Sequence, residues 1–378
     1  MNPTDSGELG SERFNPSRLR LIRHRRALTA SALAADLDVA ARTVARWEDG
    51  TVAPLTENVA ALSVTLDVPK QFFYAPDLDT VPHDIVSFRA LSKMSARQRD
   101  SATAAGSVAL ALTAWLDDRF RLPAVDVPTL EGYDPEDAAA VVRERWGLGQ
   151  APVSNVLHLL EAHGTRVYSL AGDVASVDAY SFRLDGAPYV FLNTGKTGER
   201  RRFDAAHELA HLVLHCGDEV PHGKEAEAQA QAFASAFLMP RDTVLAAGLR
   251  QAPVDRILRA KTHWKVSAMA LAHRLNELGL MSEWVYRDAC VRLSQMGYRR
   301  GEPFNPIVPE TSQVLAKMFK SLRARGVSAA DVAADLLITQ DELDQYVFGL
   351  VPVALKGGNR RTSQAAAPVL RMVRGARD

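Results

Sequence analysis

The stretch "RRFDAAHELAHLVLHCGDE", residues 201–219, carries His207 and His211 four positions apart, with Glu208 next to the first. Residues four apart share one face of a helix, so both imidazoles can reach one Zn²⁺. Glu208 lies to the side of them, where it can act as a base toward water activated by the metal. The apolar flanks are typical of a buried helix. The alternative is an ordinary buried helix whose histidines only pack.

A catalytic zinc site needs a third protein ligand, and the sequence narrows the choice. His215 lies eight residues beyond His207, about 12 Å along a helix, which is too far for one ion. A histidine six residues after the second would stand at 217, where the chain has Gly217. An acid on the next helix remains, either Glu225 or Glu227. They are two residues apart, about 200° around a helix, so only one can face the metal.

Length and composition predict several globular units inside a cell. The chain has 378 residues, 47% of them hydrophobic, and 45 basic residues balance 45 acidic ones. The two cysteines, Cys216 and Cys290, are far apart, which favours a reducing compartment over a disulfide framework. The polar first residues resemble no secretion signal, and no apolar run reaches bilayer-spanning length. We therefore expect a cytoplasmic protein without a membrane partner, and the family resemblances given below imply a bacterial one.

The pattern along the chain predicts a multidomain, mostly α fold with an α+β part. The α+β part contains a small sheet from "TRVYSL", "DAYSFRL" and "APYVFLN", followed by the helix of the histidine motif. The expected segments are a disordered lead at 1–14, a helical bundle at 15–76, a helical connector at 77–150, an α+β domain at 151–300, a linker at 301–310, a helical module at 311–352 and a tail at 353–378.

Residues 33–50, "LAADLDVAARTVARWEDG", have the layout of a helix-turn-helix. The second helix would present Arg42, Thr43 and Arg46 outward, where arginines can read guanine in the major groove of double-stranded DNA. Ala41 at its start and Thr29, the expected cap of the preceding helix, complete the candidate DNA-contacting set. Eight arginines against two acids between residues 13 and 46 support this reading. The alternative is a generic bundle with a solvated basic face.

Residues 15–74 resemble the lambda-repressor-like (XRE/Cro type) DNA-binding domain. The resemblance is carried by Trp47-Glu48-Asp49-Gly50, by Pro54 and by "LDVPKQFF". The sequence departs from the family at Asp38, where glycine is usual in the turn, although Asp tolerates left-handed backbone better than most residues. The resemblance implies a homodimer on a palindromic operator.

"HELAHLVLH" followed by "EAEAQAQAFASAFLMP" resembles the ImmA/IrrE family of zinc metallopeptidases, over about residues 150–300 and again at 87–100. In that family the metal-binding glutamate stands thirteen residues before the proline, which implies Glu227. Gln229 and Gln231 depart from the usual second Glu and Asn. The resemblance implies a Zn²⁺ cofactor, Glu208 as the catalytic base, and an XRE-type repressor or the chain's own connector as substrate.

Two details of catalysis are predicted with alternatives. A polypeptide substrate could lie as an added strand along "DAYSFRL". No oxyanion donor is evident: Tyr180 and His222 are the candidates, and a structural role is the expectation for each. A rival from another class is a DNA-binding sensor without proteolysis, whose zincin-like domain holds a small ligand such as an acyl-CoA, or only a structural metal. The histidine motif fits both.

Residues 328–349 align without a gap to residues 29–50, which predicts a second helix-turn-helix unit. Its would-be recognition helix carries Asp341, Glu342 and Asp344, and phosphates repel acids. We therefore expect this unit to contact protein, against the basic N-terminal face of its own or a neighbouring chain. The alternative is a chance likeness of two alanine-rich helices. Deleting residues 311–378 should then change oligomeric state or strengthen DNA binding, and leave zinc content unchanged.

Overall fold

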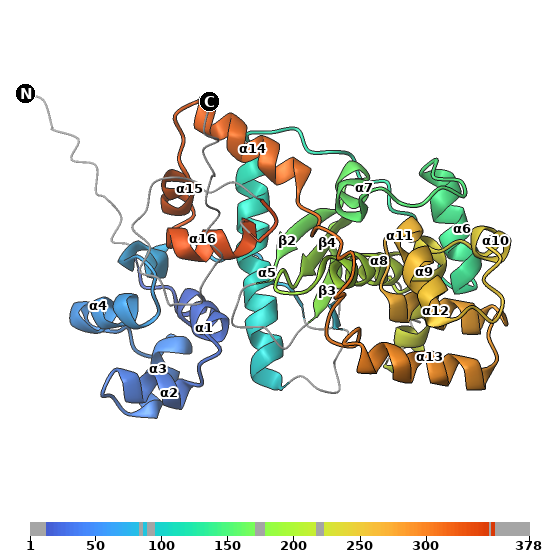
Figure 1. Ribbon diagram of the computed structural model, residues 1–378. Coiled ribbons are helices and arrows are strands. Elements are labelled where there is room, and N and C mark those ends of the chain that lie inside the picture. Colours follow the sequence, from blue (N-terminus) through green and yellow to red (C-terminus); the bar gives the residue numbers. More distant parts are fainter. Residues whose placement is uncertain are drawn as a thin grey trace, which may run out of the picture.

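A computed structural model describes residues 13–82, 86–88, 95–170, 178–216, 223–347 and 349–351. It is mostly helical with one small sheet near the middle (Figure 1), which agrees with the fold class predicted from the sequence. Within these residues no helix combines the length and apolar character needed to cross a bilayer. The predicted tail and most of the predicted lead lie outside the described residues. Phe14 is buried and stacks on Phe73, so it belongs to the bundle and not to a lead.

The N-terminal bundle is built from four helices and one 3-10 turn. Thr29 caps the second helix by accepting a hydrogen bond from the Ala32 N–H (3.1 Å), and Asp38 adopts the left-handed backbone expected of the turn (φ 54°). Val44 and Trp47 anchor the third helix in the core. The elements are α1 (Pro16–Arg25), α2 (Ala30–Asp36), α3 (Ala41–Glu48), α4 (Thr56–Thr65) and η1 (Lys70–Tyr74).

The sheet has four strands in the order β1-β3-β4-β2. The three predicted strands are present, and a fourth, β1, comes from the predicted connector. β3 and β4 form an antiparallel hairpin closed by Asp185 and Gly186, both at positive φ, as two-residue hairpin turns require. β2 pairs with β4 in parallel. The strands are β1 (Ser87–Phe88), β2 (Arg166–Ser169), β3 (Ala179–Leu184) and β4 (Ala187–Leu192).

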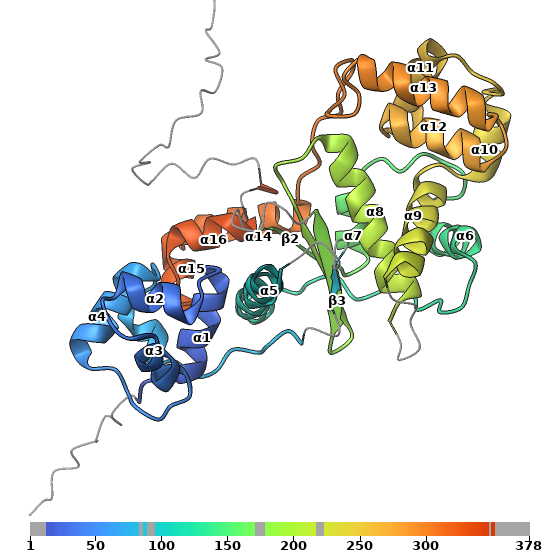
Figure 2. The ribbon, with the colours of Figure 1, turned by 90° about the horizontal axis from the view of Figure 1, so that it is seen from below.

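Alternate residues of the sheet enter two different cores. In β3 and β4, Tyr180 and Phe191 join a core shared with α5 (Ala96–Asp117), the N-terminal bundle and the C-terminal helices. Val190 and Leu192 join a second core under α8 (Gly198–Leu214). Figures 1 and 2 both show α5 between the bundle and the sheet. The predicted domain boundaries therefore do not coincide with the division between these two cores.

The second core is completed by helices on both sides of α8. α6, from the predicted connector, packs against α9, and Arg143 of α6 donates to the Phe237 carbonyl (2.6 Å). The helices are α6 (Pro135–Arg145), α7 (Val156–Ala162), α9 (Lys224–Leu238), α10 (Arg241–Ala246), α11 (Val254–Trp264), α12 (Ala268–Glu277) and α13 (Glu283–Gln295). The predicted connector thus supplies β1, α5 and α6 to the fold instead of spanning two domains.

The stretch predicted as a linker, residues 301–310, is fixed to the fold by buried acids. Glu302 pairs with Lys261 (3.1 Å) and accepts the first N–H of α12. Glu310 pairs with Arg202 of α8 and accepts the Val156 N–H (2.8 Å) at the start of α7. Because these carboxylates are buried and paired, this stretch is part of the structure and not a hinge.

The C-terminal helices repeat the helix-turn-helix layout of the bundle. α15 and α16 are displaced by 299 positions from α2 and α3 at both of their ends, and Leu337 has the left-handed backbone (φ 56°) that Asp38 has in the first unit. Leu343 and Tyr346 are buried where Val44 and Trp47 are buried. The helices are α14 (Gln313–Ala324), α15 (Ala329–Asp335) and α16 (Gln340–Val347).

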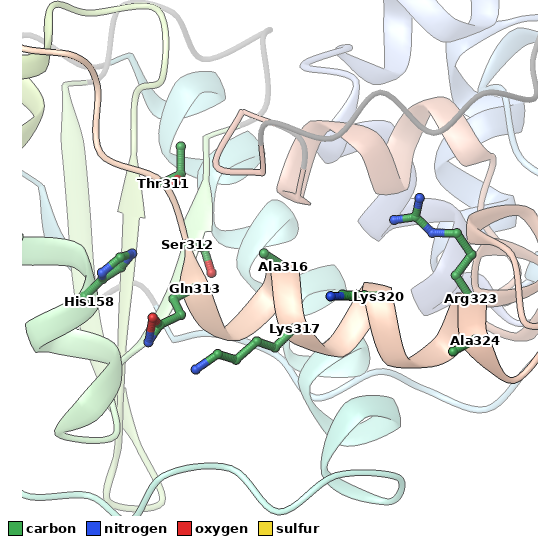
Figure 3. Close-up of a pocket in the computed structure, with 9 residues that line it drawn as sticks. All are labelled: His158, Thr311, Ser312, Gln313, Ala316, Lys317, Lys320, Arg323 and Ala324. Atoms are coloured by element: carbon green, nitrogen blue, oxygen red, sulfur yellow. The ribbon is translucent and has the colours of Figure 1, made fainter.

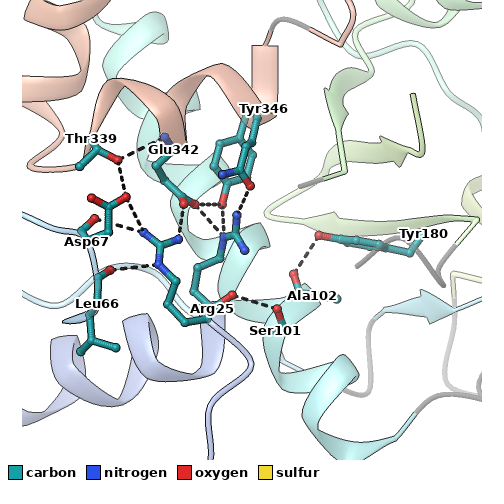
Figure 4. Close-up of polar contacts among 11 residues, drawn as sticks. Arg25, Leu66, Asp67, Ser101, Ala102, Tyr180, Thr339, Glu342 and Tyr346 are labelled. Atoms are coloured by element: carbon teal, nitrogen blue, oxygen red, sulfur yellow. Dashed lines mark hydrogen bonds and ion pairs between the residues drawn. The ribbon is translucent and has the colours of Figure 1, made fainter. Parts of the chain in front are cut away.

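The acidic helix α16 contacts the end of α1 (Figure 4). Glu342 forms ion pairs with Arg25 (2.7 Å) and Arg26, and Arg25 also donates to Gln345 and Tyr346. Arg25 and Glu342 are 0% and 1% exposed. Glu342 and Gln345 occupy the positions that Thr43 and Arg46 hold in the first unit. This is the protein contact expected of the second unit, made within the same chain.

Candidate metal centre

Helix α8 brings the two histidines of the motif together. Thr197 caps it by accepting a hydrogen bond from the Arg200 N–H, and the sheet and α9 pack along its length. His207 and His211 are 1% and 5% exposed, and their Nε2 atoms lie 3.2 Å apart. Two imidazole nitrogens thus converge on one point inside the protein.

Glu227 of α9 faces the same point. Its carboxylate oxygens lie 3.4 Å from His207 Nε2 and 3.5 Å from His211 Nε2. Burial alone would raise the pKa of Glu227, but hydrogen bonds and charge from the two imidazoles outweigh it and lower the pKa to about 2. Glu225, the other candidate ligand, is exposed. The structure therefore gathers His207, His211 and Glu227 and leaves Glu225 outside.

The geometry of these three residues fits a zinc ion. Each offers one ligand atom, and the ligand atoms all lie within 4.8 Å of one another. A tetrahedral ion with bonds of about 2.1 Å holds its ligand atoms about 3.4 Å apart. The two Nε2 atoms lie 3.2 Å apart, and each has a different oxygen of the Glu227 carboxylate near that distance, Oε2 at 3.4 Å from His207 and Oε1 at 3.5 Å from His211. Two imidazoles and one carboxylate are also the donor set of known catalytic zinc sites.

Glu208 is completely buried beside the two histidines, and β3 holds its carboxylate in place. The Ser181 hydroxyl donates to Glu208 Oε2 (2.7 Å). Ser181 was not among the residues singled out from the sequence. The available signal is its position in β3, where the alternation places it, like Ala179, on the side of the sheet that faces α8.

His215 and Gln229 lie behind His211. His211 Nδ1 is 2.9 Å from His215 Nδ1, and His215 Nε2 is 2.9 Å from Gln229 Oε1. His215 therefore contacts a metal-site histidine from the far side, in keeping with its exclusion as a ligand on distance.

Residues 160–276 match the family model of the IrrE N-terminal-like domain. The matched segment runs from α7 to α12 and contains every residue of the centre described above. It supports a metallopeptidase-like domain, with which a metal cofactor is consistent. No curated protein matches the chain.

Of the two oxyanion candidates named from the sequence, Tyr180 does not face the centre. Tyr180 points to the opposite side of the sheet, where its hydroxyl donates to the Ala102 carbonyl of α5 (2.9 Å), so it is no oxyanion donor. Cys216 is half-buried, and its thiol lies 2.7 Å from the Leu212 carbonyl; burial raises its pKa. His222, the other oxyanion candidate, lies outside the described residues.

The strand predicted to bind substrate is β3, which lies within the matched residues 160–276. β1 of the same chain already pairs with it. Ser87 lies opposite Ser181, and Phe88 lies opposite Tyr180, in antiparallel register. β4, and not β3, is the strand that directly precedes α8. A substrate strand on β3 must therefore replace these two residues or pair beyond them.

A groove lies along α14, and most of its lining residues are outside the matched segment. It is open and has a volume of about 760 Å³, and Figure 3 shows Lys317, Lys320 and Arg323 along one of its walls. His158 of α7 closes one end. None of the metal-centre residues lines it.

Four of the five candidate DNA-contacting residues lie on α3. Ala41, Arg42 and Arg46 are exposed on α3, and Thr43 is partly exposed. Thr29 stands at the start of α2. Figures 1 and 2 show α3 away from α16, so the contact between α16 and α1 leaves this face uncovered.

Proposed function

We propose that this protein is a DNA-binding transcription regulator with a zinc-dependent peptidase domain. The single observation that carries the peptidase half is the triangle of ligand atoms from His207, His211 and Glu227, which all lie within 4.8 Å of one another. A buried carboxylate, Glu208, lies beside it. Packing alone does not require two imidazoles and a carboxylate to converge on one point.

Zinc bound at this triangle supplies a Lewis acid that polarises a peptide carbonyl and makes water more acidic. Glu208 accepts the proton of the attacking water and delivers it to the leaving amide nitrogen. The hydroxyl of Ser181 restricts Glu208 to one orientation, because it donates to one carboxylate oxygen. The buried position of Glu208 excludes bulk water from the proton transfer.

The DNA-binding half of the proposal rests on α3. Its exposed arginines, Arg42 and Arg46, stand on a short helix held by the core residues Val44 and Trp47, as in a recognition helix. A double-stranded operator is the expected partner. A homodimer is the expected assembly, since the lambda-repressor-like family usually binds palindromes.

The proteolytic substrate is a second protein of the XRE repressor type or this chain itself. The test incubates the purified, zinc-loaded chain alone and with candidate repressors, with and without a chelator, and follows fragments by electrophoresis and mass spectrometry. Glu208→Gln should keep the zinc and abolish cleavage, because the amide cannot accept the proton. Chelator-resistant cleavage, or full activity in Glu208→Gln, would refute the peptidase assignment.

One observation favours the second candidate, a ligand-responsive regulator without proteolysis. The groove along α14 has the volume of a small-molecule site, and three cations line it. Within the described part of the chain, Lys317, Lys320 and Arg323 form no ion pair. An anionic ligand such as an acyl-CoA suits such a wall. Calorimetric titration of the wild-type chain and of Lys317→Glu with an acyl-CoA tests it, and equal heats from both would exclude the groove.

A further inference from the structure

His211, His215 and Gln229 form a chain of hydrogen bonds, and the donor at each step of this chain can be assigned. His211 turns its Nε2 toward His207 and Glu227, and its Nδ1 toward His215, which in turn reaches Gln229. We infer that Gln229, acting through His215, sets which nitrogen of His211 carries hydrogen and so keeps its Nε2 able to bind metal. The inference rests on the zinc site proposed above. It makes His215 and Gln229 positioning residues and not ligands.

The assignment follows from the donor and acceptor capacity of each group. An amide oxygen only accepts hydrogen bonds, so the His215 Nε2 that faces Gln229 Oε1 must carry a hydrogen. A neutral imidazole carries only one, so His215 Nδ1 is an acceptor, and His211 Nδ1 must donate to it. The lone pair of His211 is then on Nε2, the atom that faces His207 and Glu227. Metal-bound histidines generally need such a partner on their other nitrogen.

Helix α9 provides both the third ligand and the end of this chain of hydrogen bonds. Ala226 and Ala230 lie on its buried face, and Glu227 and Gln229 stand on either side of that face at about 100° per residue. One helix placement therefore brings a carboxylate to the metal side of His211 and an amide to the far side of His215. The glutamine at 229, which departs from the family pattern, thus has a defined partner.

A hydrogen-bond donor at position 229 would exchange donor and acceptor in each hydrogen bond between residue 229, His215 and His211. His215 Nε2 would have to accept, so its Nδ1 would carry the hydrogen and donate to His211 Nδ1. His211 would then carry its own hydrogen on Nε2, directed at the metal position. Lysine at 229 can only donate, whereas glutamate can only accept. These two charged substitutions at one half-buried position therefore have opposite expected effects.

The experiment measures zinc affinity of the full-length chain by competition with a chromogenic chelator. Gln229→Lys and His215→Phe should weaken zinc binding by about 10–100-fold. Gln229→Glu should match or exceed the wild type. His158→Phe, a substitution in the distant groove, is the control and should leave the affinity unchanged. Ring ¹⁵N shifts of the zinc-loaded protein should show Nδ1–H on His211 and Nε2–H on His215.

Wild-type zinc affinity in Gln229→Lys, with the circular dichroism spectrum unchanged, would overturn the inference. If His215→Phe does not fold, the comparison of Gln229→Lys with Gln229→Glu still decides. A wild-type chain that binds no stoichiometric zinc would overturn the proposed metal centre instead. The two failures are thus distinguished by the wild-type measurement.

Discussion

Among single side chains, Glu227 and Glu225 form a matched pair on the first turn of α9. Glu227 reaches both histidines and Glu225 is exposed, so only one of them completes the triangle. We expect about one zinc per chain in Glu225→Ala and far less in Glu227→Ala, since two imidazoles alone leave the ion short of a ligand. Metal analysis after dialysis measures this. Zinc loss in Glu225→Ala with full zinc in Glu227→Ala would reverse the assignment.

Arg42 and Arg46 are the residues whose removal tests operator reading. Each change to alanine should cost about 1–3 kcal/mol of specific binding, provided the guanidinium contacts a base. Arg287→Ala is a suitable control, because Arg287 is an exposed arginine on the distant helix α13. Fluorescence anisotropy with operator and scrambled DNA separates the outcomes. Equal losses on both DNAs with a smaller salt slope would make these arginines phosphate contacts.

The positive charge available to DNA is smaller than the sequence count indicates. Of the eight arginines between residues 13 and 46, Arg18, Arg23 and Arg25 are buried and donate within the protein. Arg23 pairs with Glu48, two positions before Gly50. A count along the chain cannot separate solvated arginines from structural ones, because their partners are set by the fold.

At the scale of elements, the contact of α16 with α1 depends on one buried ion pair. Glu342→Ala would leave Arg25 buried without its main counter-charge and should destabilise the fold by about 3–5 kcal/mol. Asp341→Ala, one residue earlier and exposed, should stay within about 0.5 kcal/mol of wild type. Urea denaturation of both variants measures the difference. Equal stability of the two would show that the pair contributes nothing.

The same contact should weaken in acid. Burial opposes ionisation of Glu342, but Arg25 and Arg26 outweigh it and hold its pKa below the ordinary value. A lowered folded-state pKa stabilises the contact above the unfolded pKa, about 4.3 for glutamate, and the stabilisation is lost as pH falls through the folded value. The hydrogen-exchange protection factors of α16, which correct for the slower intrinsic exchange in acid, should therefore be high at pH 7 and fall only below about pH 4.3. In Glu342→Gln this pH dependence should be much smaller.

Local sequence patterns predicted most helices and strands, whereas the contacts between these elements depend on residues far apart in the chain. The helix of His207, three strands and both helix-turn-helix units follow from periodicity, caps and turn residues. β1 is only two residues long and has no periodicity to read. The burial of Glu310 and the outward direction of Tyr180 depend on which face meets α8 and which meets α5. Glu227 was reached from the sequence through family resemblance, because residue spacing alone left Glu225 open.

At the scale of the whole molecule, the N-terminal bundle, α5 and the C-terminal helices share one core. This shared core changes what deletion of the C-terminal helices can test. The sequence predicted that deleting residues 311–378 changes oligomeric state or strengthens DNA binding, and leaves zinc content unchanged. In the structure Leu315, Phe319 and Tyr346 of the deleted segment are buried in the core that holds the bundle and α5. Burial of each contributes about 1.5–3 kcal/mol. We now expect the deletion to lower the thermal midpoint by well over about 5 °C.

Differential scanning calorimetry of the truncated chain, with zinc analysis on the same sample, is the measurement. An unchanged midpoint with zinc retained would show that the C-terminal helices form an independent domain. The Glu342→Ala variant is the milder control, since it removes the ion pair and leaves the apolar side chains in place.

The contact of α16 with α1 also determines how the chain responds to mechanical force. The first and last helices of the described chain touch directly, so tension applied at the two ends passes through Arg25 and Glu342. The same end of the chain also contacts the sheet and α8, because α16 packs on β2 and Arg201 of α8 donates to the Gly349 carbonyl (3.4 Å). His207, His211 and Glu227 are not part of the α1–α16 contact, so we expect tension on the two ends to load that contact before the metal centre. In optical-tweezers extension, the first rupture should be this contact, with His207, His211 and Glu227 still folded around their ion.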